Sequence, residues 1–160
     1  MFKIFGILLL SVIPISVGFK KSRQLTLQKK DIDGLLFLVH ECRQNIAYQQ
    51  LPLSELIGQL PRRRYRIIDC LIEHIQLSSP LTAWNNSKSI MTHPQALAVM
   101  TDYFSALGTS DRDTQLEICN RTAARLDEIR LAFDSEISAK AKLYRTIGIL
   151  AGIFIAIILI

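Results

Sequence analysis

The sequence predicts an all-α protein: an antiparallel bundle of about six helices, flanked by an N-terminal and a C-terminal transmembrane helix. Apolar residues recur at steps of three and four along most of the chain, which is typical of amphipathic helices. No segment alternates apolar and polar residues with β-branched enrichment, so no strand is expected. Outside residues 20–145 the only charged side chain is Lys3. We therefore expect a transmembrane helix over residues 1–19, a helical bundle over 20–145 and a second transmembrane helix over 146–160.

The N-terminal segment is short for a membrane helix. Residues Ile4 to Phe19 carry no charge, and a helix of that length spans roughly 24 Å, against a hydrocarbon core of about 30 Å. A secretory signal is the alternative, with Lys3 as its basic start and Ser16-x-Gly18 as its cleavage site. We expect an uncleaved anchor, because cleavage would export the bundle and leave the C-terminal segment in the wrong orientation.

Proline, glycine and capping residues divide the middle of the chain. Leu51-Pro52 ends one helix, Pro61 suits the first turn of another, and His93-Pro94 opens a later one. Gly108 is expected to cap the helix that precedes it. The helices expected in this region cover residues 23–50, 53–60, 62–77, 81–90 and 93–107. In the helix over 62–77 the apolar spacing places five residues on the inward face: Ile67, Ile68, Leu71, Ile72 and Ile75.

The last expected helix runs from Asp111 to the C-terminus. Up to Tyr144 its apolar residues keep to one face, and no proline interrupts it. After Arg145 every side of the helix becomes apolar. We therefore expect the last helix of the bundle to be continuous with the C-terminal membrane anchor.

The basic residues favour a membrane over a nucleic acid as partner. The formal net charge is +5, and Lys and Arg gather on the inner side of both apolar segments, from Lys20 to Lys30 and from Lys140 to Arg145. By the positive-inside rule we expect the bundle to be cytoplasmic. The three cysteines show no Cys-x-x-Cys spacing, so reduced core thiols are expected.

No catalytic, cofactor-binding or metal-ligating set stands out, so we expect no enzyme and no cofactor. A glycine-rich phosphate loop is absent from the sequence. Cys70-x-x-x-His74 lacks a second pair of ligands at zinc spacing. Asp31-x-Asp33-Gly34 begins like a calcium loop, but neither the glycine nor the acid that such a loop needs follows at the required position.

Two motifs carry the remaining functional expectations. Four arginines at the expected start of a helix form a candidate docking patch for an acidic partner or for lipid headgroups, with a solvated helix start as the alternative: Arg62, Arg63, Arg64 and Arg66. In the C-terminal apolar run, Gly148-x-x-x-Gly152 is a candidate packing face for a membrane helix, because small residues four apart let helix backbones approach closely.

Five short motifs occur in the same order as in a known family. They are Gly18-Phe19 before a basic cluster, Ile46-Ala47-Tyr48 with Pro52-Leu53-Ser54-Glu55, Ala83-Trp84, Leu107-Gly108-Thr109-Ser110-Asp111 with Gln115, and Lys142 to Gly152. With these motifs the chain resembles, nearly end to end, the stage III sporulation protein AB family of endospore-forming bacteria. One departure is Asn45, where the family usually has an acidic residue before the Ile-x-Tyr triplet.

The resemblance implies a fold and a role beyond what the residue patterns predict. The soluble domain of this family is similar to the six-helix inner-membrane platform domain of type II secretion and type IV pilus machines. Its members are expected in the mother-cell membrane around the forespore, in a secretion-like channel complex with a cytoplasmic secretion-type ATPase and other membrane subunits, and self-association is left open. The alternative function is a membrane-tethered helical module for regulation or signalling.

Overall fold

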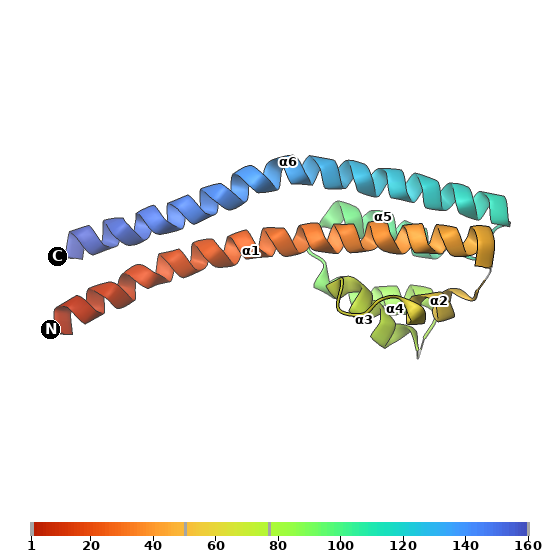
Figure 1. The fold of residues 1–160 in the computed structure, drawn as a ribbon, viewed down its shortest axis with the longest axis horizontal. Coiled ribbons are helices and arrows are strands. Elements are labelled where there is room, and N and C mark those ends of the chain that lie inside the picture. Colours follow the sequence, from red (N-terminus) through yellow and green to blue (C-terminus); the bar gives the residue numbers. More distant parts are fainter. Residues whose placement is uncertain (1, 50, 77, 160) are drawn as a thin grey trace. The chain divides into compact units, whose positions relative to one another are not determined.

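The structure is a computed structural model that describes residues 2–49, 51–76 and 78–159. Within this part the side chains of residues 2–15, 138, 152, 155, 156, 158 and 159 are not described. The described chain forms six α-helices and no strands, which confirms the predicted all-α class (Figure 1). The helices are α1 (Phe2–Gln44), α2 (Leu53–Gln59), α3 (Arg66–Ile75), α4 (Pro80–Ser87), α5 (Pro94–Ala106) and α6 (Arg112–Leu159).

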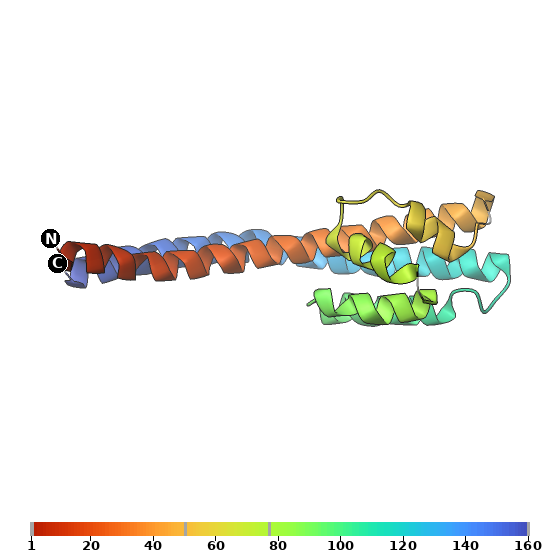
Figure 2. The same ribbon diagram turned by 90° about the horizontal axis from the view of Figure 1, so that it is seen from below.

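The contacts divide the chain into two compact units. Unit 1 consists of residues 1–27 and 133–160, and unit 2 of residues 28–132. In unit 1 the N-terminal part of α1 and the C-terminal part of α6 lie side by side and antiparallel (Figures 1 and 2). They lie close together at Gly18, where an added Cβ would lie 2.6 Å from the Tyr144 carbonyl oxygen.

Helix α1 joins two elements that the sequence suggests as separate. It runs without a break to Gln44 and ends in a short π-helical turn, Asn45–Gln49. A lone glycine such as Gly18 costs a helix only about 1 kcal/mol, and the packing of Gly18 against α6 offsets that cost.

Among the residues that the structure describes, no helix contains an apolar stretch of the length and hydropathy needed to cross a membrane. The predicted membrane helix over residues 1–19 falls largely on side chains outside the description. So does part of the one predicted over 146–160.

The core of unit 2 is built from all six helices. In both views the C-terminal part of α1 and the N-terminal part of α6 are antiparallel neighbours (Figures 1 and 2). Trp84 of α4 is fully buried and its ring is stacked on Phe104 of α5 at 5.3 Å. The Tyr103 hydroxyl of α5 lies 3.5 Å from the Cys119 thiol of α6. The five residues predicted to face inward on α3 are all buried: Ile67, Ile68, Leu71, Ile72 and Ile75.

Local capping explains where α4, α5 and α6 begin. The Ser79 hydroxyl accepts the Thr82 N–H at 3.4 Å, and His93 Nδ1 accepts the Ala96 N–H at the same distance. Both helices place proline next, where the missing N–H costs nothing. Asp111 accepts the Thr114 hydroxyl at 2.7 Å and the Thr114 N–H at 3.3 Å and so caps α6, and these hydrogen bonds lower the pKa of its carboxyl group.

Helix α3 begins later than predicted, at Arg66 instead of residue 62. Tyr65 is extended, and Arg63 has a φ of +66°, in the left-handed region, so the chain leaves helical geometry there. Electrostatics favours this result, since guanidinium groups in the first turn would face the positive end of the helix dipole. Arg62, Arg63 and Arg64 therefore lie in a loop and not on a helix.

Candidate functional site

The exposed loop formed by Arg62, Arg63 and Arg64, here called the arginine loop, is held in one conformation. The Arg63 N–H donates to Asp69 Oδ1 at 2.8 Å. The Arg64 guanidinium lies over the rings of Phe37 and Tyr65, 5.0 and 5.3 Å from their centroids, a favourable cation–π geometry. The Arg62 and Arg63 guanidinium groups have no hydrogen-bond or ion-pair partner in the described part of the chain. The loop thus presents positive charge from a preorganised backbone.

Arg66 belongs to the same sequence motif but has a different role. Its Nη2 donates to Asp31 Oδ2 at 2.5 Å and to the Ile90 carbonyl oxygen at 3.2 Å. The Asp31 side chain is almost fully buried. Burial raises the pKa of Asp31, while the hydrogen bond and charge of Arg66 oppose the rise. Arg66 therefore fastens α3 to α1 inside unit 2, and three of the four predicted arginines remain available to a partner.

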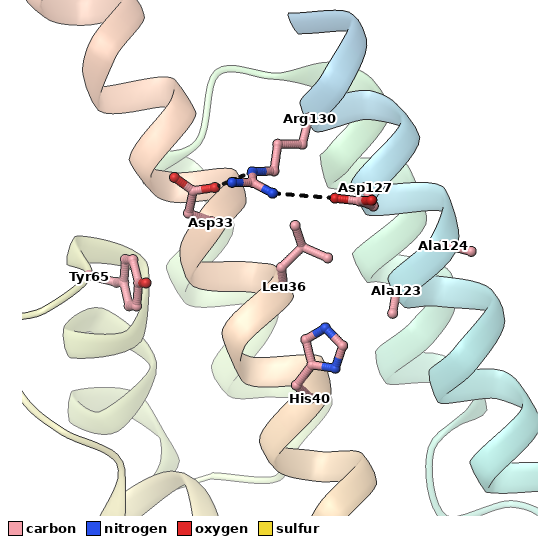
Figure 3. Close-up of a pocket in the computed structure, with 8 residues that line it drawn as sticks. All are labelled: Asp33, Leu36, His40, Tyr65, Ala123, Ala124, Asp127 and Arg130. Atoms are coloured by element: carbon pink, nitrogen blue, oxygen red, sulfur yellow. Dashed lines mark hydrogen bonds and ion pairs between the residues drawn. The ribbon is translucent and has the colours of Figure 1, made fainter. Parts of the chain in front are cut away.

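A pocket of about 590 Å³ opens beside Tyr65 in unit 2. Figure 3 shows Leu36 on its floor and the Arg130 guanidinium at one end, between the carboxylates of Asp33 and Asp127. Arg130 Nε lies 2.7 Å from Asp33 Oδ1, and Nη1 lies 3.4 Å from Asp127 Oδ1. The remaining residues that line the pocket are His40, Ala123 and Ala124. None of the side chains drawn in Figure 3 forms a nucleophile–base pair, so the pocket can receive a side chain but shows no catalytic geometry.

The metal-like motifs of the sequence are used for internal contacts. Asp31 and Asp33 bind Arg66 and Arg130. His74 Nδ1 lies 2.8 Å from the Cys70 carbonyl oxygen within α3. In the described residues no group of three or more His, Cys, Asp and Glu side chains is placed to hold a metal ion.

The predicted glycine packing face is used in part within the chain itself. Gly148 is buried in unit 1, and its Cα would lie 3.2 Å from a Cβ added at Gly18. One turn further along α1, the Ser22 hydroxyl is buried and lies 3.4 Å from Arg145 Nη2. Gly152 lies among the residues whose side-chain surroundings are not described. Gly148 therefore packs against the other helix of the same chain.

A comparison with protein families decides the classification. The model of the family described as Stage III sporulation protein AB matches residues 3–160. The chain belongs to the stage III sporulation protein AB family. No curated protein and no solved structure gives a significant match. Membership of the stage III sporulation protein AB family gives the chain a role in sporulation, and this family is not known as one of enzymes.

Asn45 stands where the resemblance leads us to expect an acidic residue, and it is the first residue of the π-helical turn after α1. Its side chain is buried, its Nδ2 donates to the Leu51 carbonyl oxygen at 2.8 Å, and its Oδ1 accepts the Leu51 N–H at 3.0 Å. A carboxylate can accept the N–H but cannot donate to the carbonyl. The amide therefore closes the turn after α1 with both hydrogen bonds.

Two glycines, Gly18 and Gly34, allow close helix contacts that the sequence alone does not reveal. The missing side chain of Gly18 lets α6 approach closely, and that of Gly34 lets Tyr65 approach closely. A Cβ added at Gly34 would lie 2.9 Å from Tyr65 Cβ and 3.1 Å from Ile67 Cγ2. A glycine in a helix usually signals only reduced helix propensity. Their close contacts come from segments distant in sequence, which no local pattern reveals.

We predict that Gly34→Ala destabilises the protein by about 1–3 kcal/mol, because the added methyl group displaces Tyr65 at its Cβ. Helix propensity alone would stabilise it by up to about 1 kcal/mol. The matched control is Gly58→Ala in α2, where an added Cβ has no neighbour within 4 Å, and this change should be stabilising. Urea unfolding of both variants, followed by circular dichroism, measures the sign; stabilisation by Gly34→Ala would contradict the contact.

Proposed function

We propose that the chain is a non-enzymatic, membrane-anchored platform subunit of a secretion-like channel complex between mother cell and forespore. In this role unit 2 is cytoplasmic and binds a cytoplasmic secretion-type ATPase, while unit 1 holds the protein in the mother-cell membrane beside the other channel subunits. The family's role in sporulation supports the setting. The assembly and the ATPase follow from the resemblance to secretion platform proteins.

The surface of unit 1 supports membrane anchoring. Large apolar side chains on both of its helices are exposed, where a water-soluble protein would cover them. They include Val17, Phe19, Leu143, Ile147, Ile149, Leu150, Ile153, Phe154 and Ile157. Leu150 and Phe154 are 59% and 64% exposed, so packing between the two helices of unit 1 does not cover them. A hydrocarbon phase is the surrounding that suits such a surface.

The position and charge of the arginine loop are the main support for the proposed binding to the ATPase. Unit 2 contains twelve Lys and Arg and twelve Asp and Glu, so it has no net charge with which to attract a partner. The arginine loop concentrates three positive charges on a backbone fixed by Asp69, with Arg64 held over two rings. A fixed, local charge of this kind favours a complementary acidic surface and gives orientation as well as attraction.

We predict that replacing Arg62, Arg63 and Arg64 with Glu weakens binding of the purified ATPase to the full-length protein by at least about tenfold, because three contacts become repulsive. Arg66 is left unchanged, since it holds α3 to α1 through Asp31. Fluorescence anisotropy with a labelled ATPase measures the effect. Raising the salt concentration should weaken wild-type binding by screening the attraction, and should strengthen binding of the variant by screening the repulsion.

The control variant carries the same number of charge reversals on other exposed residues of unit 2: Arg43→Glu, Arg121→Glu and Arg125→Glu. It should bind like the wild type. Equal affinities for wild type and arginine-loop variant would remove the loop from the interface. A pull-down that recovers a kinase or transcription factor in place of secretion subunits would instead support a regulatory module.

A further inference from the structure

The net charge of the protein is located entirely in unit 1. This unit contains seven Lys and Arg but only two acids, Asp134 and Glu136, while the charges of unit 2 balance. Glu136 is paired with Lys140 at 2.5 Å. Five of the seven basic residues lie near the inner ends of the exposed apolar surface: Lys20, Lys21, Arg23, Lys142 and Arg145.

Arg145 has two side-chain partners in unit 1, and neither of them is acidic. Its guanidinium lies 5.7 Å from the centroid of the Phe19 ring, and its Nη2 lies 3.4 Å from Ser22 Oγ. A ring and a hydroxyl fix the position of the group without neutralising it. In the described part of the chain no ion pair is formed by Arg145. The arrangement leaves a positioned cation ready for an anion.

Helix geometry adds two further cations on the same side. Arg23 follows Phe19 by four residues on α1, and Lys142 precedes Arg145 by three on α6. Residues three or four apart share a face of a helix. Because α1 and α6 are antiparallel in unit 1, Arg23 and Lys142 both extend from the Phe19–Arg145 contact away from the apolar end.

The apolar surface begins immediately on the other side of this contact. Val17 and Ile147 are 55% and 52% exposed. Beyond them, toward the two chain ends, Lys3 is the only charged residue. Three cations beside an abrupt apolar boundary match the layer of phosphate groups at the edge of a bilayer, where each Lys or Arg contributes to binding anionic lipid.

We propose that Arg23, Lys142 and Arg145 form a binding site for the phosphate of an anionic phospholipid headgroup, with Phe19 positioning Arg145. This inference rests on the membrane anchoring proposed above. It assigns to unit 1 a lipid preference that does not involve the arginine loop. Apolar anchoring needs no headgroup charge, and therefore the two ideas can fail separately.

The test uses the full-length protein in neutral detergent micelles that contain equal amounts of phosphatidylglycerol and phosphatidylcholine with identical acyl chains. Native mass spectrometry counts each lipid retained. The wild type should retain phosphatidylglycerol over phosphatidylcholine by at least about fivefold, the effect of one surface cation. Arg23→Gln, Lys142→Gln and Arg145→Gln together should remove the preference. Arg145→Lys, which keeps the charge, should retain most of it.

The matched control loses three charges from exposed residues of unit 2 instead: Arg43→Gln, Arg121→Gln and Arg125→Gln. Its preference should equal that of the wild type, and circular dichroism checks that every variant is folded. A preference that persists in the triple unit 1 variant, or disappears in the control, overturns the site. Flotation with phosphatidylcholine vesicles separates the two proposals: failure to float overturns both, while flotation without a headgroup preference overturns only the lipid site.

Discussion

Gly18→Leu is expected to reduce heat-resistant spores to the level of a strain that lacks the protein. Even the Cβ of the new side chain would lie 2.6 Å from the Tyr144 carbonyl oxygen and 3.2 Å from Gly148 Cα. Both are backbone atoms and cannot rotate away, so the two helices of unit 1 must separate or shift. The measurement is the spore titre after heating, in a strain whose only copy of the gene carries the change.

Val17→Leu is the matched control, because Val17 is the next residue on the same helix and is 55% exposed. It should sporulate normally. Gly18→Ala adds only the Cβ and should fall between the two. Immunoblots must show similar protein amounts, and wild-type spore numbers with Gly18→Leu would mean that close approach of the unit 1 helices is dispensable.

Trp84→Ala is expected to lower the free energy of unfolding by about 3–5 kcal/mol, the usual cost of removing a fully buried aromatic side chain. Trp84 is 0% exposed, stacks on Phe104, and donates its Nε1–H to Thr101 Oγ1 at 3.0 Å. A whole domain is typically stable by only about 5–15 kcal/mol, so this single change should leave unit 2 close to unfolding. Urea unfolding of the full-length protein followed by circular dichroism gives the value.

Trp84→Phe separates the two contributions of the indole. It keeps an aromatic ring beside Phe104 but loses the hydrogen bond to Thr101, so a smaller loss of roughly 1–2 kcal/mol is expected. In the wild type, tryptophan fluorescence gives an independent measure of unfolding, because Trp84 is the only tryptophan. If the alanine and phenylalanine variants were equally stable, the ring would contribute no packing.

Local patterns predicted the helices of this protein better than its contacts. The spacing of Ile67, Leu71 and Ile75 identified the buried face of α3, and His93-Pro94 marked the start of α5. Both signals depend on residues within one or two turns. The prediction of a helix start at residue 62 was wrong: Arg63 is left-handed, its N–H donates to the Asp69 side chain, and the helix begins only at Arg66.

The candidate sites show the same division. The four-arginine motif was visible in the sequence, but the burial of Asp31 against Arg66, which removes one arginine from the surface, was not. Gly148 was predicted to pack against a membrane helix, and nothing in the sequence indicated that Gly18, near the other end of the chain, lies beside it. Pairings over such distances are set by tertiary packing, on which a single sequence carries no direct information.

The burial of cysteines in the core of unit 2 also has a chemical consequence. Cys42 is fully buried in the same core, and burial raises the pKa of its thiol to about 12; burial also raises the pKa of Cys119. Only the thiolate reacts with oxidants and alkylating agents, and at neutral pH such a shift lowers the thiolate fraction of Cys42 roughly a thousandfold. These thiols are therefore unreactive while unit 2 is folded. The rate at which they are alkylated reports how often unit 2 unfolds locally.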